Sequence, residues 1–147
     1  MHIREAQPRD LPALVALLSQ LHEDDPEDYP GRASAYDAAF AAIAADPRQR
    51  LYVIEREGAI AGSAQLVVVP NLTHGGRPYA VIESVVIDRG LRSRGYGERL
   101  MRRLIDEARA AGCYKVALTS HRSRANAHRF YERLGFAFAH KGYRLDL

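Results

Sequence analysis

The segment from Val85 to Gly97 constrains the fold most, because an apolar strand there passes through a basic, glycine-spaced turn into a long amphipathic segment. The start of such a helix carries backbone N–H groups without helical partners and the positive end of the helix dipole. Gly95 and Gly97 have no Cβ atom to block an anion, and Arg92 and Arg94 add positive charge. We therefore expect linked phosphates to bind at this turn.

The turn fits neither of the two most common nucleotide-binding loops. A P-loop needs Lys followed by Ser or Thr after its last glycine, whereas Gly97 is followed by Glu98 and Arg99. A dinucleotide-binding fold needs G-x-G-x-x-G, which is also missing at this position. The spacing therefore indicates a different carrier of pyrophosphate. A basic turn that only begins a surface helix would contain similar residues, so that alternative stays open at this point.

Two motifs relate the chain to a known family. The hexamer from Arg92 to Gly97 resembles the R/Q-x-x-G-x-G/A signature of the GNAT superfamily of N-acetyltransferases, whose turn binds the pyrophosphate of acetyl-CoA. The superfamily's other pattern, N-x-x-A/S-x-x-F-Y-x-x-x-G-F, is matched at Phe130, Tyr131, Gly135 and Phe136, with Ala127 at its small position. The asparagine departs in spacing, because Asn126 lies four residues before Phe130 instead of six. The resemblance covers nearly the whole chain.

This resemblance implies an acetyl-CoA-dependent N-acetyltransferase that needs no metal. In the superfamily's fold two neighbouring strands, here Tyr79–Ile87 and Tyr114–Ser120, separate, and the pantetheine arm of the cofactor lies in the gap. The residues expected to contact acetyl-CoA are Val85, Val86, Ile87, Arg92, Ser93, Arg94, Gly95, Tyr96, Gly97, Glu98, Asn126, His128, Phe130 and Arg133. Asn126 can also cap the helix that it begins, and Arg133 can also be a solvated helix charge.

The order of predicted elements is β-α-α-β-β-β-α-β-α-β-β. The resemblance implies an α/β (α+β) class with the GNAT fold, a mixed, mostly antiparallel twisted sheet flanked by about four helices. The expected strands are His2–Ala6, Leu51–Glu57, Ala59–Val69, Tyr79–Ile87, Tyr114–Ser120 and a last hairpin over Phe136–Leu147 that turns at Lys141-Gly142. The expected helices are one that Asp10 can cap, one from Ser34 to Pro47, Glu98–Ala111 and Asn126–Leu134.

Bulk composition agrees with this interpretation and decides little alone. A chain of 147 residues with 47% hydrophobic residues suits one domain over residues 1–147. A single cysteine, Cys113, excludes an internal disulfide framework, and the first residues are neither a signal peptide nor a membrane span, so we expect a cytoplasmic protein. The net charge of +3 reflects 21 Lys and Arg against 18 Asp and Glu, which suits a polyphosphate cofactor as well as a nucleic acid. The six histidines show no metal-ligand spacing.

Glu83 is the candidate general base. An alkylammonium acceptor must lose a proton before it attacks the thioester, and a carboxylate can accept that proton through a water molecule. Strict alternation places Val81, Val85 and Ile87 on the face of Glu83 and Ala80, Ile82 and Val86 on the other, so the strand is expected to be buried on both sides. A buried carboxylate needs a use or a partner. The alternative is a glutamate paired with an arginine at the sheet surface.

Tyr131 is the candidate general acid. The resemblance implies that its hydroxyl lies at the sulfur of acetyl-CoA, where a phenol with a pKa near 10 can protonate the departing thiolate. The alternative is a ring packed on the core with a solvated hydroxyl. The fold implies the Val86 N–H as the donor to the oxyanion. Cys113 follows the helix-ending Gly112 and is expected to be a packed thiol.

The acceptor is the least constrained part. The acidic stretch from Glu23 to Pro30 is expected to line the acceptor pocket and would favour a cationic amine. Against this, the stretches Pro70–His74, Ile82–Val86 and Gly112–Lys115 resemble glucosamine 6-phosphate N-acetyltransferases, and Ala127–Tyr131 resembles aminoalkylphosphonate N-acetyltransferases. Those acceptors are anionic, and the residues that could hold a phosphate or phosphonate are Arg77, His121, Arg122 and Arg124.

We therefore expect a small-molecule amine as the acceptor, with no nucleic acid and no membrane as partner. A protein or peptide amine is the alternative acceptor. A catalytically inactive acyl-CoA-binding regulator is a further alternative. A small basic module that binds DNA or RNA is less favoured, because the chain lacks base-stacking aromatic residues on a strand face. The superfamily often dimerises through its last strands, so the resemblance allows a homodimer.

Overall fold

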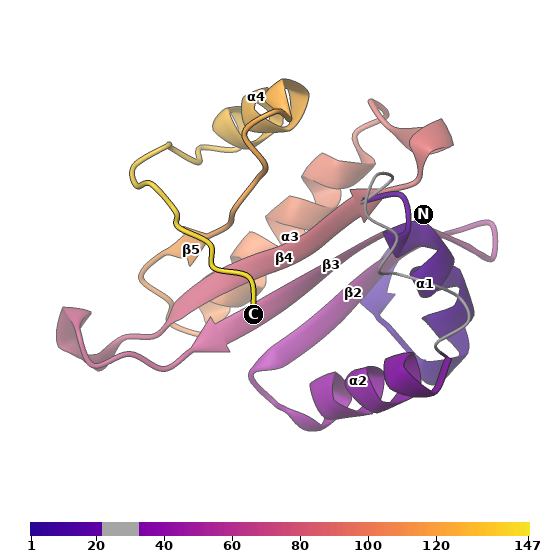
Figure 1. Cartoon of the computed structure of the whole chain (residues 1–147), viewed down its shortest axis with the longest axis horizontal. Coiled ribbons are helices and arrows are strands. Elements are labelled where there is room, and N and C mark those ends of the chain that lie inside the picture. The colour runs from indigo at the N-terminus through magenta and orange to yellow at the C-terminus, as the bar shows by residue number, and fades with distance from the viewer. Residues whose placement is uncertain (22–32) are drawn as a thin grey trace. The chain divides into compact units, whose positions relative to one another are not determined.

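The computed structural model describes residues 1–21 and 33–147, which form two compact units, 1–117 and 118–147. The first unit contains a five-stranded sheet in the order β1-β2-β3-β4-β5 (Figure 1). Its strands are β1 (His2–Glu5), β2 (Gln49–Arg56), β3 (Ala59–Val69), β4 (Tyr79–Ile87) and β5 (Val116–Ala117). Neighbours from β1 to β4 are antiparallel, and β5 is parallel to β4. The mixed, mostly antiparallel α/β class is therefore confirmed.

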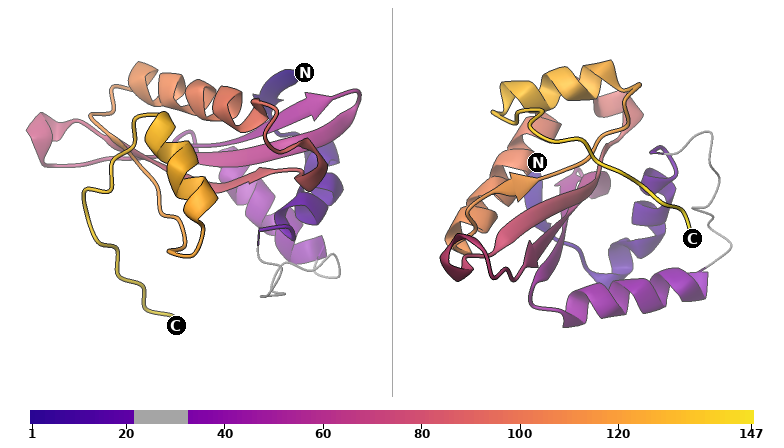
Figure 2. Two further views of the ribbon diagram at one scale, coloured as in Figure 1. Left: turned by 90° about the horizontal axis from the view of Figure 1, so that it is seen from above. Right: turned by 60° about the vertical axis from the view of Figure 1, so that its left-hand side comes forward.

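Helices cover both faces of this sheet. The first unit contains η1 (Pro8–Asp10), α1 (Leu11–Leu18), α2 (Ala33–Ala45), η3 (His74–Gly76), η4 (Arg89–Leu91) and α3 (Tyr96–Ala110). Helix α3 lies on one face, and α1 and α2 lie on the other (Figure 2). The second unit contains α4 (Ala125–Arg133). The expectation of one domain over the whole chain stays a prediction.

The core between α3 and the sheet follows from the amphipathic pattern of α3. Leu100, Met101 and Leu104 are fully buried, and they recur at helical spacing along one side of the helix. Tyr52 and Leu66 are buried beneath α3, and the Arg103 guanidinium lies 5.7 Å from the centre of the Tyr52 ring. The predicted start of this helix, Glu98, is two residues after its observed start at Tyr96.

The β2–β3 hairpin is formed as predicted, because its two-residue turn has the required backbone. Glu57 has a φ of 53° and Gly58 a φ of 81°, and two positive φ values in succession match the right-handed twist of the strands. The second predicted helix is also confirmed as α2, with Phe40 buried and Tyr36 and Ile43 half-buried. These features depend on residues that are close together in sequence.

A β-bulge in β4 overturns the predicted assignment of its two faces. Ser63 pairs with Val86 and Gln65 pairs with Glu83, so β4 has one residue more than β3 in this interval. Ser84 takes up the extra residue with a φ of 52°. Glu83 and Val86 therefore share the face of α1 and α2, although strict alternation had separated them.

Ile87 lies on the opposite face, against the same expectation. A Cβ placed on Gly62 would come 2.7 Å from Ile87 Cδ1 and 2.9 Å from Ile54 Cδ1, so both isoleucines pack over this glycine. Gly62 is the register partner of Ile87. The absence of a Cβ on Gly62 thus makes room for the Ile54 and Ile87 side chains beside the end of β4.

Two predicted strands differ from the structure. The strand expected over Tyr114–Ser120 is reduced to the two residues of β5, which pair only with Ala80 and Val81. The hairpin predicted over Phe136–Leu147 is wrong, since the second unit has no strand in the part of the chain described. An isolated hairpin is only marginally stable without a sheet or an apolar face to cover it. Phe138 and Tyr143, which would have formed its apolar face, are 86% and 96% exposed.

Asp10 precedes α1 as expected but does not cap it with its side chain. Its carboxylate instead accepts two hydrogen bonds from the Arg4 guanidinium, at 2.7 and 2.9 Å, and one from the Gln7 N–H at 2.7 Å. Arg4 Nε also donates to Glu55 at 2.7 Å. The hydrogen bonds from Arg4 hold the pKa of Asp10 below its usual value, although burial opposes this. This ion cluster ties β1, β2 and the start of α1 together.

We predict that Asp10→Asn lowers the free energy of unfolding at pH 7 by about 1–3 kcal/mol, because Arg4 loses its bidentate acceptor. Since folding lowers the pKa of Asp10, this stabilisation is complete above the unfolded value of about 3.9 and is lost as the pH falls further. Urea unfolding of both proteins from pH 7 to pH 3 should show the difference shrinking in acid. Asp106→Asn, at an exposed pair on α3, is the matched control and should change stability by less than about 1 kcal/mol.

Candidate active site

The turn between β4 and α3 is shaped by its own polar groups. Asp88 accepts the Gly90 N–H at 2.9 Å through Oδ1, and its carbonyl accepts the Leu91 N–H at 2.8 Å. The Arg92 guanidinium donates to the Ile87 carbonyl at 3.2 Å. These bonds bend the chain through η4, so that the next residues lead directly into α3.

Beyond this bend, the backbone offers a run of unpaired donors. From Arg92 to Glu98, the N–H groups have no hydrogen-bond acceptor within residues 1–21 and 33–147. Gly95 stands at the start of α3 with a φ of 80°, which glycine adopts without strain. Apart from the chain neighbours of Gly95, no heavy atom of residues 1–21 and 33–147 lies within 4 Å of the position that a Cβ on Gly95 would take, so no described side chain fills the space beside this glycine.

The charges around the corner suit an anion. Arg92, Ser93 and Arg94 are exposed. The carboxylate of Glu98 accepts from Arg102 at 2.8 Å, which leaves the backbone N–H of Glu98 as its contribution to an anion site. Unpaired N–H groups at a helix start, together with guanidinium groups, fit the linked phosphates of acetyl-CoA.

The edge of β4 that faces β5 is open over most of its length. Pairing with β5 involves only Ala80 and Val81 among the described residues. Asp88 donates its N–H to the Ala61 carbonyl of β3 at 2.9 Å, so Val86, two residues earlier and opposite Ser63, also directs its N–H toward β3. Alternation then leaves the backbone groups of Val85 and the N–H of Ile87 at the open edge, since the Ile87 carbonyl accepts from Arg92. Such groups can pair with the amides of an extended ligand.

Glu83 is exposed rather than buried, contrary to the expectation from the apolar strand. Its carboxylate makes no hydrogen bond or ion pair with any residue of the described ranges. The alternative, in which Glu83 pairs with an arginine, is therefore not seen among the described residues. The bulge at Ser84 follows directly, where the register shift interrupts the alternation of β4.

Sequence reasoning missed a polar neighbour of Glu83. Gln65 is its register partner on β3, on the same face of the sheet. The Gln65 amide donates to Gln49 Oε1 on β2 at 2.7 Å. The signal was a glutamine inside the otherwise apolar run from Ala59 to Val69, which alternation alone could not place beside Glu83.

In the second unit, Tyr131 lies in the last turns of α4, and its carbonyl takes part in the hydrogen bonds that end this helix. The Phe136 N–H donates to the Tyr131 carbonyl at 3.1 Å, and the Gly135 N–H donates to the Glu132 carbonyl at 2.9 Å. Gly135 has a φ of 93°, and the rings of Tyr131 and Phe136 are in edge contact at 6.0 Å. This is a Schellman helix end, which requires a glycine four residues after the tyrosine and an apolar residue next. The F-Y-x-x-x-G-F motif therefore has a structural cause as well as a functional implication.

The Tyr131 side chain is 9% exposed, and its hydroxyl has no hydrogen-bond partner in the described part of the chain. Burial raises the pKa of Tyr131, and the positive charge of Arg124 opposes the rise. Phe130 packs against Tyr131 with ring centres 5.2 Å apart. The phenol is therefore protonated at neutral pH and free to donate.

Of the remaining candidates on α4, only Asn126 departs from its expected structural role, and the predicted cofactor contacts stay predictions. Asn126 does not cap α4, because the helix begins at Ala125, with Arg124 at the cap position, and the Asn126 side chain accepts a hydrogen bond from Arg129. The ring of His128 contacts the His121 carbonyl at 2.9 Å. Arg133 is exposed in the last turn.

A group of cations and aromatic rings lies at the other end of β4. The His74 ring stacks on Tyr114 at 3.9 Å, and Arg77 lies 5.8 Å and Lys115 5.5 Å from the centre of the Tyr114 ring. Neither cation has a carboxylate partner among the described residues. Tyr79 completes the group through an edge contact with Tyr114 at 6.4 Å. We call these five residues the His74–Lys115 cluster.

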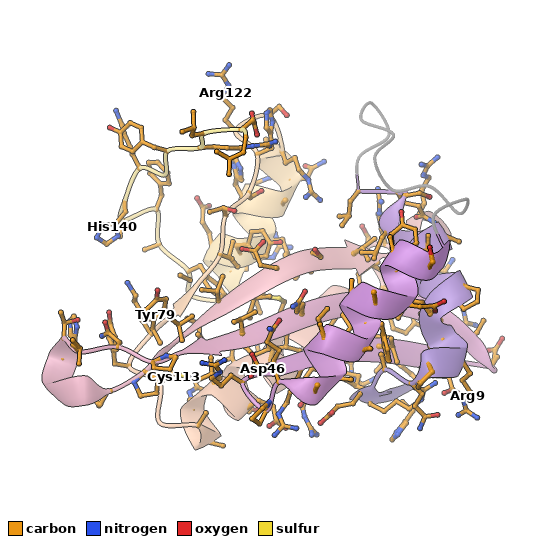
Figure 3. The ribbon with its side chains drawn as sticks, turned by 60° about the horizontal axis from the view of Figure 1, so that its bottom comes forward. Arg9, Asp46, Tyr79, Cys113, Arg122 and His140 are labelled. Carbon is orange, nitrogen blue, oxygen red and sulfur yellow. The ribbon has the colours of Figure 1, made fainter. Side chains whose placement is uncertain are left out.

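Cys113 precedes Tyr114 of this cluster and lies before β5. Figure 3 shows Tyr79 and Cys113 at the same end of the sheet, where the Tyr114 N–H donates to the Pro78 carbonyl at 2.9 Å. Burial raises the pKa of the Cys113 thiol, which makes it a poor nucleophile at neutral pH. The packed thiol expected from the sequence agrees with this environment.

The acidic stretch from Glu23 to Pro30, which was expected to line the acceptor pocket, lies outside the described residues. Within residues 1–21 and 33–147, no three His, Cys, Asp or Glu side chains are grouped so as to hold a metal ion. No helix in the same ranges has the length and apolar character that crossing a membrane requires.

The model of the Acetyltransferase (GNAT) family matches residues 14–136. The chain therefore belongs to the GNAT acetyltransferases, a family that uses acetyl-CoA as cosubstrate, and the resemblance seen in its motifs is confirmed.

Among its relatives, glucosamine 6-phosphate N-acetyltransferase of Trypanosoma brucei brucei is 34% identical over 153 residues, covering 100% of this chain and 96% of the relative. Aminoalkylphosphonate N-acetyltransferase of Salmonella typhimurium is 30% identical over 138 residues, covering 94% and 86%. A solved structure described as a transcriptional regulator from Bacillus halodurans C-125 has a TM-score of 0.90 and 32% identity over 99% of each chain.

We predict that the midpoint of the Tyr131 titration lies above the ordinary tyrosine value of about 10, because burial disfavours the phenolate. NMR of tyrosines labelled with carbon-13 at Cζ would follow each ring, with Tyr131→Phe assigning the signal. Tyr52, whose pKa burial also raises, is assigned with Tyr52→Phe. A Tyr131 signal that titrates below pH 10 would contradict this assignment.

Proposed function

We propose that this protein transfers the acetyl group of acetyl-CoA to the primary amine of a small anionic molecule, by direct attack within a ternary complex. The observation that carries the proposal is the open corner at the start of α3, where the N–H groups from Arg92 to Glu98 lack acceptors in the described chain. Linked phosphates supply the acceptor oxygens that these donors need.

The cofactor site extends from this corner along the open edge of β4. Residues 92 to 98 would hold the pyrophosphate, and the backbone of Val85 and Ile87 would pair with the pantetheine amides. Val86, which lies between Val85 and Ile87, would belong to the same segment of the cofactor site. On α4, we propose that Asn126, His128, Phe130 and Arg133 contact the rest of the cofactor, as the family motif implies.

Glu83 would act as the general base. Its exposed carboxylate, unpaired within the described ranges, can accept a proton from the acceptor ammonium, directly or through one water, and Gln65 beside it can orient that water. The free amine then forms a bond to the acetyl carbon. Because the register directs the Val86 N–H toward β3, we propose the Val85 N–H as the donor to the developing oxyanion.

Tyr131 would act as the general acid. As the carbon–sulfur bond breaks, its phenol gives a proton to the sulfur. The attacking nitrogen loses its second proton as it becomes an amide, and this proton returns to the phenolate through solvent. The raised pKa of Tyr131 supports this direction, because the group starts the reaction protonated. The products are free coenzyme A and an N-acetylated amine.

An anionic acceptor is favoured by two observations. The two relatives with the names given above act on an amino sugar phosphate and on aminoalkylphosphonates. The His74–Lys115 cluster supplies two cations without carboxylate partners in the described ranges. Tyr79, Val81 and Glu83 follow one another on one face of β4, so this cluster lies about 13 Å along the strand from the proposed base.

The test is thiol release from acetyl-CoA over a panel of amines. The panel contains glucosamine 6-phosphate, aminomethylphosphonate, spermidine, an aminoglycoside, and peptides with a free lysine or N-terminus. The proposal expects turnover with at least one anionic small amine and at least tenfold lower kcat/KM for the polyamine. Preference for the cationic amines or peptides would reject the anionic acceptor while keeping the transfer reaction.

A regulator that binds acetyl-CoA without using it is the second candidate. The Bacillus halodurans structure described as a transcriptional regulator supports it, since that chain has the same fold at 32% identity. Binding of acetyl-CoA by calorimetry with no thiol release on any amine would favour this candidate. Absence of acetyl-CoA binding would reject both the transferase and the regulator.

We predict that Glu83→Gln and Tyr131→Phe each lower kcat by about 100-fold or more, because each removes a proton transfer. Their dissociation constants for acetyl-CoA should stay within about threefold of the wild type, since neither residue contacts the phosphates. Glu57→Gln, in the exposed β2–β3 turn, and Tyr143→Phe, at a 96% exposed ring, are the matched controls. Unchanged kcat in both active-site variants would reject these two roles.

A further inference from the structure

Gln20 joins the end of α1 to the start of the β4–α3 turn. Its amide donates to Asp88 Oδ2 at 3.2 Å, and its Oε1 accepts the Arg89 N–H at 3.0 Å. The two partners follow each other directly at the end of β4, so one side chain holds two consecutive residues. We call this pair of hydrogen bonds the Gln20 clamp.

The chemistry of the partners fixes the orientation of the Gln20 amide. The Asp88 carboxylate only accepts hydrogen bonds, and the Arg89 N–H only donates, so Nε2 and Oε1 cannot exchange places. Asp88 is also the residue whose other oxygen holds the Gly90 N–H and whose carbonyl holds Leu91. The clamp therefore acts on the residue that sets the path of the whole turn.

We propose that Gln20 is a positioning residue for acetyl-CoA, which it affects by holding the turn in the conformation that presents residues 92 to 98 to the pyrophosphate. This inference rests on the proposed function of that turn. Gln20 itself contacts none of the residues from Arg92 to Glu98 through a hydrogen bond. Its effect is on the fraction of molecules whose turn is ready to bind, and the apparent dissociation constant rises as that fraction falls.

The size of the effect follows from the exposure of the clamp. Gln20 and Asp88 are half-buried and line a groove of about 630 Å³ between α1 and the β2–β3 hairpin, which water can enter. Hydrogen bonds in such a place contribute modestly, and one of the two is to a charged group. Loss of the clamp should therefore raise the dissociation constant for acetyl-CoA by about tenfold.

Reversal of donor and acceptor tests the clamp directly. In Gln20→Glu the new carboxylate can still accept from Arg89 but repels Asp88, and in Asp88→Asn two amide donors face each other. The double variant Gln20→Glu/Asp88→Asn restores both bonds: the donor and acceptor between positions 20 and 88 are exchanged, the side chain at position 20 still accepts from Arg89, and the amide oxygen introduced at position 88 still accepts from Gly90. We expect each single variant to bind acetyl-CoA about tenfold more weakly and the double variant to return to within about threefold of the wild type.

A donor without pyrophosphate separates positioning from general damage. With S-acetylpantetheine as donor, Gln20→Glu should keep the wild-type kcat/KM, and with acetyl-CoA it should raise KM while kcat at saturation stays unchanged. Equal losses with both donors, or additive losses in the double variant, would overturn the inference. Wild-type affinity for acetyl-CoA in both single variants would overturn this inference and leave the proposed function standing. A wild-type protein that binds no acetyl-CoA would overturn the proposed function as well.

Discussion

The backbone N–H groups from Arg92 to Glu98, at and just before the start of α3, have no acceptor in the described chain. A glycine in the left-handed conformation starts α3 at this point, and the turn before it is bent by Asp88. Among the described residues, donors and positive charge meet here, with space left free beside Gly95. The demand of those donors for oxygen atoms connects the sequence motif to a phosphate-bearing cofactor.

The second constraint is the extra residue in β4. Without the bulge at Ser84, Glu83 would lie on one face of a continuous alternating strand, and Val86 would lie on the other. With it, the exposed carboxylate shares a face with Val86 and lies directly before the segment whose edge β5 leaves open. One local irregularity thus brings the proposed base and the free backbone donors to adjacent positions of a single strand.

The features that were predicted correctly from the sequence depend on neighbouring residues. The Glu57-Gly58 turn, the apolar stripe of α3 and the spacing from Tyr131 to Phe136 each follow from local backbone or helical geometry. The features that were missed depend on partners far away. Asp10 binds Arg4 instead of capping α1, β5 forms only where β4 accepts it, and Gln20 is paired with a residue 68 positions away. The bulge was missed because its left-handed residue is a serine, which gives no local signal.

Hydrogen exchange of the backbone amides, resolved by NMR, tests the central claim most directly. In the free protein the N–H groups from Arg92 to Glu98 should exchange rapidly, because the described chain gives them no acceptor. Saturating acetyl-CoA should slow their exchange more than that of any other turn, and S-acetylpantetheine should leave it unchanged. Rapid exchange of these amides in a protein fully loaded with acetyl-CoA would contradict the account.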